Sequence, residues 1–169
     1  MKKIPIGTKS FSRLVEGNYY FVDKILMIKE FLDRVTDVTL ITRPRRFGKT
    51  INMSMMAEFF DITKDSKEIF KGTKIMETPC AAEINQYPTI FISFADAKRD
   101  KETVVSTIRT QIQNQWDKYD FVFENLKGFR KTNYERLYEV LADNNKNNLK
   151  GIDDAISFLM EIMEDYYGK

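Results

Sequence analysis

The sequence of 169 residues contains no histidine and a single cysteine, Cys80. Without histidine, the commonest general base and the commonest zinc ligand of proteins are both missing. One cysteine excludes a disulfide framework and a cysteine-based metal site within the chain. Because no histidine is present to activate its thiol, Cys80 is interpreted as a packed side chain rather than a nucleophile.

Long apolar runs are missing as well. No stretch approaches the ~20 apolar residues that a membrane-spanning helix needs, and the lysines at positions 2 and 3 precede no apolar run of the kind found in signal peptides. We therefore predict no membrane partner and, by default, a cytoplasmic location. The sequence is 43% hydrophobic and 31% charged, which is typical of a globular fold. The net charge of +2 is too small to indicate a nucleic-acid partner by itself.

The apolar residues form two strand-like and five helix-like patterns. Short β-branched runs predict buried strands over Val38–Thr42 and Thr89–Phe94. Helical periodicity predicts helices over residues 24–35, 50–60, 100–116, 132–141 and 153–167. Thr132 and Glu135 have the spacing of a capping box, which predicts the start of the fourth helix. Strands alternating with helices indicate an α/β fold, and such sheets normally have ~5 strands, so the predicted sheet is incomplete.

The turn between the first strand and the next helix reads Arg-Pro-Arg-Arg-Phe-Gly-Lys-Thr. It matches the P-loop pattern, a glycine, four residues and then Gly-Lys-Ser/Thr, except that Arg43 replaces the first glycine. Gly48 lets backbone N–H groups close on phosphate oxygens, Lys49 brings a charge to the β- and γ-phosphates, and Thr50 offers a hydroxyl to Mg²⁺. The pattern predicts a site for ATP and Mg²⁺, with Thr50 as metal ligand. The predicted nucleotide contacts are Arg43, Pro44, Arg45, Arg46, Phe47, Gly48, Lys49 and Thr50.

Three arginines, Arg43, Arg45 and Arg46, crowd this turn and admit three interpretations. They are phosphate contacts, a nucleic-acid patch or a solvated surface. We favour at least one of them contacting phosphate or an acidic neighbour, because the guanidinium group binds such anions in bidentate fashion. Aromatic residues do not interleave with the arginines as a base-stacking surface requires.

The turn over residues 43–50 resembles the signature of the AAA-ATPase-like family of bacterial proteins, which often carry a C-terminal PD-(D/E)XK-nuclease-like domain. The segment Tyr19–Lys24 is similar to that family's Tyr-Val-Asp-Lys segment, and the predicted strand 89–94 and last helix follow in the family's order. In that family an arginine in place of the first glycine is normal. By this resemblance Asp23 and Lys24 lie on the adenine side of the nucleotide; the alternative is a helix cap and a surface lysine.

The resemblance also implies what the chain lacks. The family's Walker B strand, ending in Asp-Glu, would follow the last helix, whereas this sequence ends at Gly168-Lys169. We therefore expect residues 1–169 to be the N-terminal portion of an AAA-ATPase-like domain, with an N-terminal segment and helix over 1–36 and a truncated P-loop core over 37–169. The expected fold is an incomplete α/β P-loop NTPase domain with few parallel strands and several helices.

No catalytic residue is assigned. Asp96 follows the second predicted strand and imitates a Walker B acid, but without a second acid beside it Asp96 is interpreted as a solvated loop residue. The chain alone is therefore expected to bind ATP without hydrolysing it, and whether it is an enzyme stays open. The alternative is a non-hydrolysing interaction module whose apolar faces bind another chain or the missing C-terminal half. A nucleic-acid-binding domain that uses the arginines is a weaker alternative.

Overall fold

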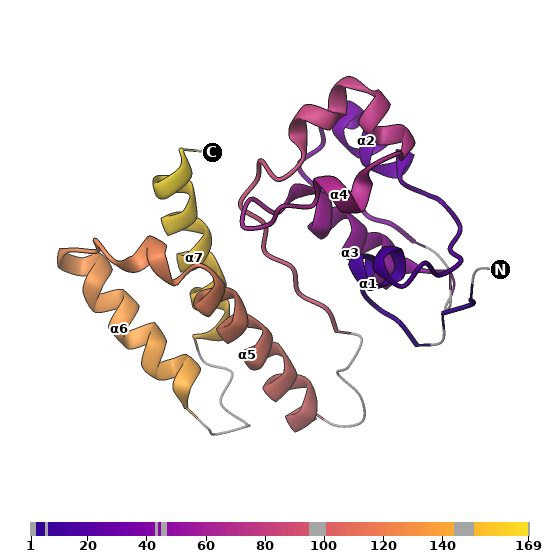
Figure 1. Cartoon of the computed structure of the whole chain (residues 1–169). Coiled ribbons are helices and arrows are strands. Elements are labelled where there is room, and N and C mark those ends of the chain that lie inside the picture. Colours follow the sequence, from indigo (N-terminus) through magenta and orange to yellow (C-terminus); the bar gives the residue numbers. More distant parts are fainter. Residues whose placement is uncertain are drawn as a thin grey trace. The chain divides into compact units, whose positions relative to one another are not determined.

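The computed structural model describes residues 3–5, 7–42, 44, 47–94, 101–143 and 151–168, and within residues 101–103 only the backbone. The chain divides into two compact units, Met1–Thr89 and Ile90–Lys169. Both units are built from helices (Figure 1). No helix in the described part of the chain is long and apolar enough to cross a bilayer.

The predicted α/β fold with parallel strands is wrong, because the described residues form no β-strand. Residues 38–42 and 89–94 have no regular secondary structure. Elsewhere in the described residues there are two isolated bridges, Lys3 with Tyr19 and Asp61 with Tyr87. A β-branched run becomes a strand only beside a second backbone that satisfies its N–H and C=O groups. Within the described residues, no backbone–backbone hydrogen bond reaches residues 38–42, so this predicted strand has no neighbouring strand.

Side chains take the place of a neighbouring strand along residues 90–94. The Gln111 amide accepts a hydrogen bond from the Ser93 N–H at 2.5 Å and donates one to the Ser93 carbonyl oxygen. The Gln115 side chain accepts one from the Phe91 N–H at 3.5 Å. Because Gln111 and Gln115 are one helical turn apart, they reach alternate residues of the extended segment. Backbone groups of this segment thus form hydrogen bonds with the side chains of a helix rather than with a neighbouring strand.

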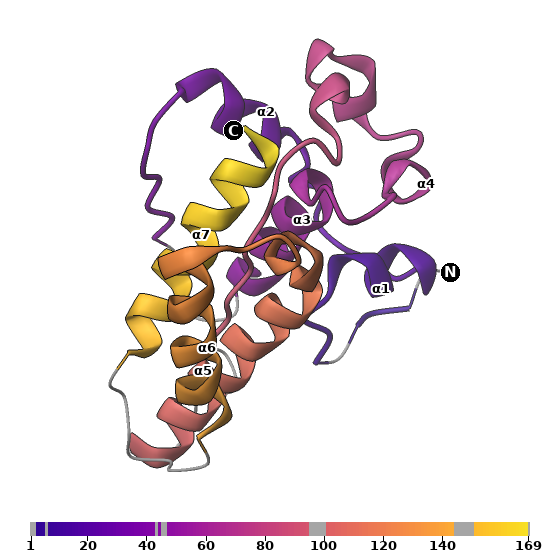
Figure 2. The ribbon, with the colours of Figure 1, turned by 90° about the vertical axis from the view of Figure 1, so that its left-hand side faces the viewer.

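The first unit surrounds one apolar helix, α3 (Lys49–Phe60). Its other helices are α1 (Phe11–Glu16), α2 (Leu26–Arg34), α4 (Lys67–Phe70) and the short 3₁₀ helices η1 (Lys74–Glu77) and η2 (Pro79–Glu83). Helix α1 packs on α3, and both views show the two side by side (Figures 1 and 2). The sequence predicted α2 and α3 within two residues at each end, and the structure confirms both helices.

Aromatic rings form the core around the C-terminal half of α3. Phe59 meets the Phe70 ring edge to face at 5.2 Å, and Phe70 stacks on Phe11 at 5.4 Å. Such pairs add about 0.5–1.5 kcal/mol beyond the burial of their area. The buried apolar cluster consists of Phe11, Ile25, Ile28, Met55, Phe59, Phe60, Phe70, Ile75 and Ile84. This cluster fixes the position of α3 in the first unit.

A polar network holds the C-terminal end of α3. Asn85, in the left-handed conformation with φ of 55°, donates from its side-chain amide to the carbonyl oxygens of Glu58 and Asp61 at 3.2 and 2.8 Å. The buried Glu58 carboxylate accepts hydrogen bonds from the Ser66 hydroxyl at 2.8 Å and from Lys64 at 2.6 Å. Helix ends leave carbonyl groups without intrahelical partners, and this network satisfies them inside the protein.

The second unit packs three long helices together: α5 (Lys101–Lys118), α6 (Gly128–Ala142) and α7 (Ile152–Tyr167), with the short η3 (Asp120–Phe123) after α5. All three long helices were predicted, but α6 begins at Gly128, so Thr132 lies inside the helix and the capping-box prediction is wrong. The Thr132 hydroxyl instead donates to the Gly128 carbonyl at 3.5 Å, as threonine often does within helices. The Trp116 indole N–H donates to the Ala155 carbonyl at 3.1 Å, which joins α5 to α7.

The aromatic core predicts a large effect of Phe59→Ala. Phe59 is 0% exposed, and truncating such a residue costs about 3–5 kcal/mol, a large share of a typical domain's stability. Met53→Ala on the same helix is the matched control, because Met53 is 46% exposed and its truncation is expected to cost roughly 0.5 kcal/mol or less. Urea denaturation followed by circular dichroism measures both changes, and similar midpoints would contradict this account of the core.

Candidate nucleotide-binding site

The turn before α3 places a glycine where the helix begins. Gly48 is the N-cap residue, in the left-handed conformation with φ of 74°, and its carbonyl accepts the N–H of Asn52 at 2.9 Å. A residue with a Cβ adopts this conformation only at a cost of roughly 1–2 kcal/mol. The structure thus gives a physical reason for the glycine that the motif requires.

The N-terminus of α3 is suited to an anion. The helix offers no carbonyl to the first N–H groups, from Lys49 onward. The first turn contains no acidic residue, and the N-cap residue, Gly48, has no side chain with which to cap it. Because the helix dipole adds partial positive charge at this end, a phosphate placed here accepts several N–H bonds in a favourable field.

Lys49 folds back over the turn that precedes it. Its ammonium donates to the Pro44 carbonyl oxygen at 3.0 Å, and its side chain is exposed. Thr50, in the first turn of α3, is half-buried. Of the eight predicted contacts, the structure therefore brings together Pro44 and residues 47–50. The predicted contacts Arg43, Arg45 and Arg46 lie outside the described residues.

A cavity of about 320 Å³ opens beside Gly48. Its floor is formed by the buried Phe11, Leu14 and Met55, whereas the aromatic Tyr20 and Phe47 on its rim are exposed. The N-terminal segment, α1, the segment after α1, the turn and α3 all contribute to the lining, which comprises Pro5, Phe11, Leu14, Tyr20, Phe21, Val22, Lys24, Phe47, Gly48, Ile51, Asn52 and Met55.

The two residues proposed for the adenine side play different roles. Lys24 lines the cavity, and its ammonium donates to the Phe47 carbonyl at 3.4 Å. The Asp23 carboxylate accepts the N–H of Ile25 at 2.9 Å, at the start of α2. Asp23 thus bonds the backbone just before α2, while Lys24 connects the segment after α1 to the turn.

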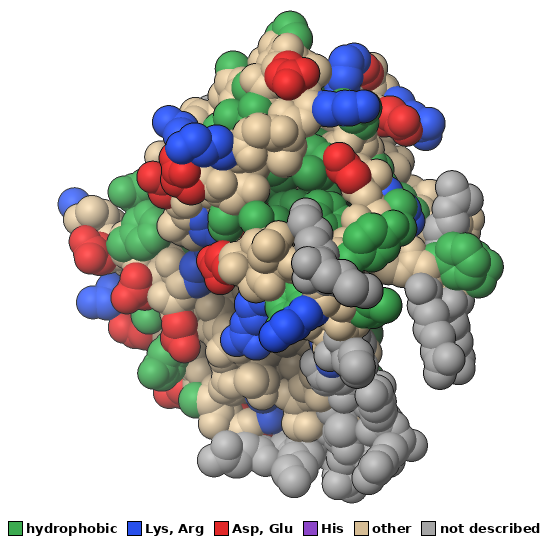
Figure 3. All heavy atoms as spheres, turned by 45° about the vertical axis from the view of Figure 1, so that its right-hand side comes forward, with side chains coloured by type: hydrophobic (Ala, Val, Ile, Leu, Met, Phe, Trp, Pro, Cys, Tyr) green, Lys and Arg blue, Asp and Glu red, His purple; other side chains and the backbone are tan. Residues whose placement is uncertain are grey.

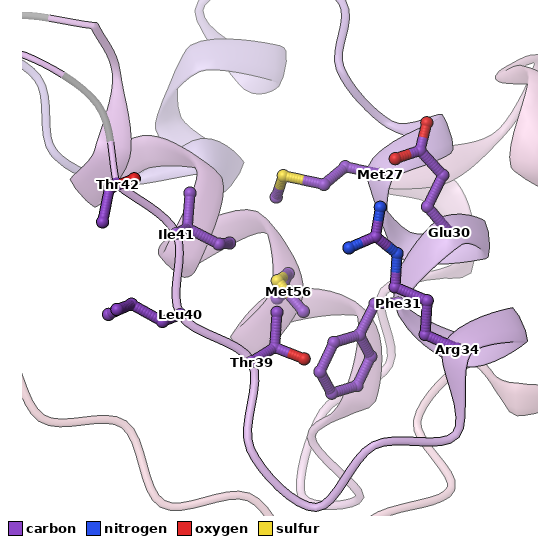
Figure 4. Close-up of a pocket in the computed structure, with 9 residues that line it drawn as sticks. All are labelled: Met27, Glu30, Phe31, Arg34, Thr39, Leu40, Ile41, Thr42 and Met56. Atoms are coloured by element: carbon purple, nitrogen blue, oxygen red, sulfur yellow. The ribbon is translucent and has the colours of Figure 1, made fainter.

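A second cavity, of about 270 Å³, lies between α2 and the extended segment 39–42 (Figure 4). Met27 and Phe31 face it from α2, Met56 from α3, and Thr39 and Ile41 from the extended segment. Its charged groups are on Glu30 and Arg34. Sequence reasoning missed both cavities, because their linings combine residues that are far apart in the chain.

Acidic residues contribute little to the site as described. Among the residues that the structure describes, no group of three or more Asp, Glu or Cys side chains is placed to hold a metal ion. Asp96, the residue that imitates a Walker B acid, lies outside the described residues. Thr50, which the sequence predicts as the metal ligand, lies in the first turn of α3.

The chain belongs to the predicted AAA-ATPase family, whose model matches residues 5–166. This confirms the resemblance seen in the turn 43–50 and the segment Tyr19–Lys24. The chain is also 36% identical over 75 residues to "Uncharacterized protein in vnfD 5'region" of Azotobacter chroococcum mcd 1. That match covers 44% of this chain and 14% of the relative, so the chain spans a small part of the relative's length. No solved structure matches the chain.

Two glycines allow the backbone role of the turn to be tested. Gly48 and Gly72 both have φ of 74°, and an added Cβ would meet only the Asn52 Oδ1 at 4.0 Å in the first case and nothing within 4 Å in the second. Gly48→Ala and Gly72→Ala are therefore expected to lose similar stability, about 1–2 kcal/mol each. Only Gly48→Ala is expected to weaken binding of inorganic tripolyphosphate, measured by calorimetry. Equal binding by the two variants would contradict an anion site at this turn.

Proposed function

We propose that this member of the predicted AAA-ATPase family binds Mg·ATP through the turn 43–50. The observation that carries the proposal is the left-handed Gly48, followed directly by Lys49 and Thr50 at the N-terminus of α3. This conformation aims backbone N–H groups at one point outside the helix, where a phosphate binds.

Each residue of the turn has a defined task in the proposal. The α3 N–H groups and Gly48 hold phosphate oxygens, and the Lys49 ammonium exchanges the Pro44 carbonyl for the β- and γ-phosphates. The Thr50 hydroxyl supplies one ligand to Mg²⁺. Phosphate oxygens and water supply the other ligands, as is common for this ion. Mg²⁺ neutralises charge on the phosphates when it is bound.

The proposal covers binding and assigns no catalytic residue. Hydrolysis requires a residue that positions the attacking water, commonly with an acidic residue on the metal. Asp96 is not proposed for this task, since the residue directly after it is Ala97 rather than a second acid. The chain alone is proposed to bind the nucleotide without hydrolysing it.

A second candidate function, a protein-interaction module, is favoured by one surface. Val35, Val38 and Leu40, within six consecutive residues, are each more than four-fifths exposed, and Leu40 also lines the cavity of Figure 4. Large apolar side chains gathered in this way often mark a contact surface. For nucleic acid the support is weaker, because acidic and basic side chains are interspersed over the face shown in Figure 3.

Lys49→Ala tests the proposed function. Losing a charge-assisted hydrogen bond costs about 1.5–3 kcal/mol, so the affinity for Mg·ATP is expected to fall by roughly 10- to 100-fold in calorimetric titrations. Lys71→Ala is the matched control, since Lys71 is an exposed lysine that pairs with Glu68 away from the turn. Unchanged affinity in Lys49→Ala would rule out the assignment.

The interaction module makes a different prediction. If the surface at Val38 and Leu40 binds a second chain, the variant Val38→Ser/Leu40→Ser is expected to shift sedimentation toward the monomer at concentrations where the unmodified chain associates. Its affinity for Mg·ATP is expected to stay the same. Phe129→Ser, which alters an exposed aromatic residue of the second unit, serves as control. An unmodified chain that stays monomeric would argue against this function.

A further inference from the structure

The extended segment 38–42 has backbone groups that another strand could pair with. Among the described residues, none of its N–H or C=O groups has a hydrogen-bond partner, and only the Thr39 hydroxyl is bonded, to the Thr36 hydroxyl at 2.9 Å. Residues 90–94 provide a contrast, because two glutamine side chains of α5 bond their backbone. No side chain does this for residues 38–42 within the described part of the chain, so the segment is an uncovered edge.

The two faces of this segment differ. The side chains of Thr39 and Ile41 point toward α2 and α3, whereas the Leu40 side chain between them points to the other side of the segment (Figure 4). Val38 and Leu40 are alternate residues, which share a face of an extended chain, and both are 84% exposed. The segment therefore has one face toward its own helices and one bare apolar face, while its backbone edge is open.

The segment also lacks the features with which proteins block an exposed edge. Such edges commonly contain charged side chains, above all lysine, or a proline. Residues 38–42 contain no charged residue and no proline, and the nearest examples are Asp37 before the segment and Pro44 after it. An edge of this kind binds an extended backbone whose alternate side chains are apolar or β-branched.

A second copy of the same segment has this chemistry. When two copies run antiparallel with Thr39 opposite Thr39, the Val38 of each copy lies opposite the Leu40 of the other. Cross-strand threonine pairs and apolar pairs both stabilise a ribbon, and no like charges meet, because Asp37 lies opposite Ile41. The pairing uses one patch on both copies, as in the two-fold symmetric dimers that are the commonest oligomers.

We infer that residues 38–42 pair antiparallel with the same residues of a second copy of this chain, with Thr39 on the two-fold axis. The inference rests on the interaction module of the proposed function and names its partner and its mode of contact. A ribbon of this length is smaller than a standard protein interface, so the dimer is expected to form weakly, with a Kd of roughly 10 μM to 1 mM.

Single-cysteine variants test the register. Thr39→Cys and Thr42→Cys are each made in a Cys80→Ala background, and both replace an exposed threonine of the segment. In this register the two Thr39 Cα atoms lie about 4.5–5.5 Å apart, within reach of a disulfide, whereas the two Thr42 Cα atoms lie roughly 20 Å apart. With oxidised glutathione as oxidant, Thr39→Cys is expected to form a disulfide-linked dimer at least about tenfold faster than Thr42→Cys.

Non-reducing gels measure both rates, and circular dichroism verifies that both variants fold. Equal rates of cross-linking would indicate random collision or a parallel pairing, and either would overturn the inference. Absence of the linked dimer in Thr39→Cys would overturn it as well.

Amide hydrogen exchange separates strand pairing from a contact made by side chains alone. In an antiparallel pair, every second residue of each strand directs its N–H to the partner. When the unmodified chain is concentrated from about 10 μM to 1 mM, exchange is expected to slow by roughly tenfold at alternate residues of 38–42. Exchange in α6 is the control and is expected to stay the same.

Sedimentation of the same samples distinguishes failure of the inference from failure of the proposed function. A dimer without slowed exchange at alternate residues would overturn the strand pairing and retain the interaction module. A chain that stays monomeric up to about 1 mM would overturn both. The nucleotide site is tested separately by Lys49→Ala, so neither outcome can be confused with its failure.

Discussion

The burial of α3 is the constraint on which the first unit depends. Its C-terminal half is fixed by the rings of Phe11, Phe59 and Phe70, and its last carbonyl groups by Asn85. A helix held at one end has a fixed axis, so the direction of the N–H groups at its other end is fixed as well. The other end can begin at Gly48, an N-cap residue without a side chain, because the stability of α3 comes from elsewhere along its length.

Much of the local structure could be predicted from the sequence, because it depends on neighbours in the chain. The 3.6-residue periodicity located α2, α3, α5, α6 and α7, and the Gly-Lys-Thr motif located the turn. The fold class could not be predicted, since a strand needs a partner that its own sequence does not specify. Residues 90–94 illustrate this: Gln111 and Gln115 provide the hydrogen bonds that a second strand would have provided.

The candidate site also has one part that the sequence predicts and one part that it does not. The motif predicts the phosphate end, since its residues are consecutive and their chemistry is local. The cavity beside Gly48 combines Pro5, Leu14, Tyr20 and Met55 with the turn, and no spacing rule connects these residues before the chain folds. Membership of the predicted AAA-ATPase family agrees with the motif in the turn, whereas the cavity is seen only in the structure. Lys24 links the two, as its ammonium contacts the turn from the segment that edges the cavity.

The Pro44 carbonyl oxygen, which accepts a hydrogen bond from Lys49, competes with any anion for the Lys49 ammonium. Any anion that recruits the ammonium must first displace a neutral acceptor that is always present at short range. An anion with one phosphate gains little over that acceptor, whereas a chain of phosphates engages the ammonium and the helix N-terminus together. Under the proposed function, this competition would favour triphosphates over inorganic phosphate.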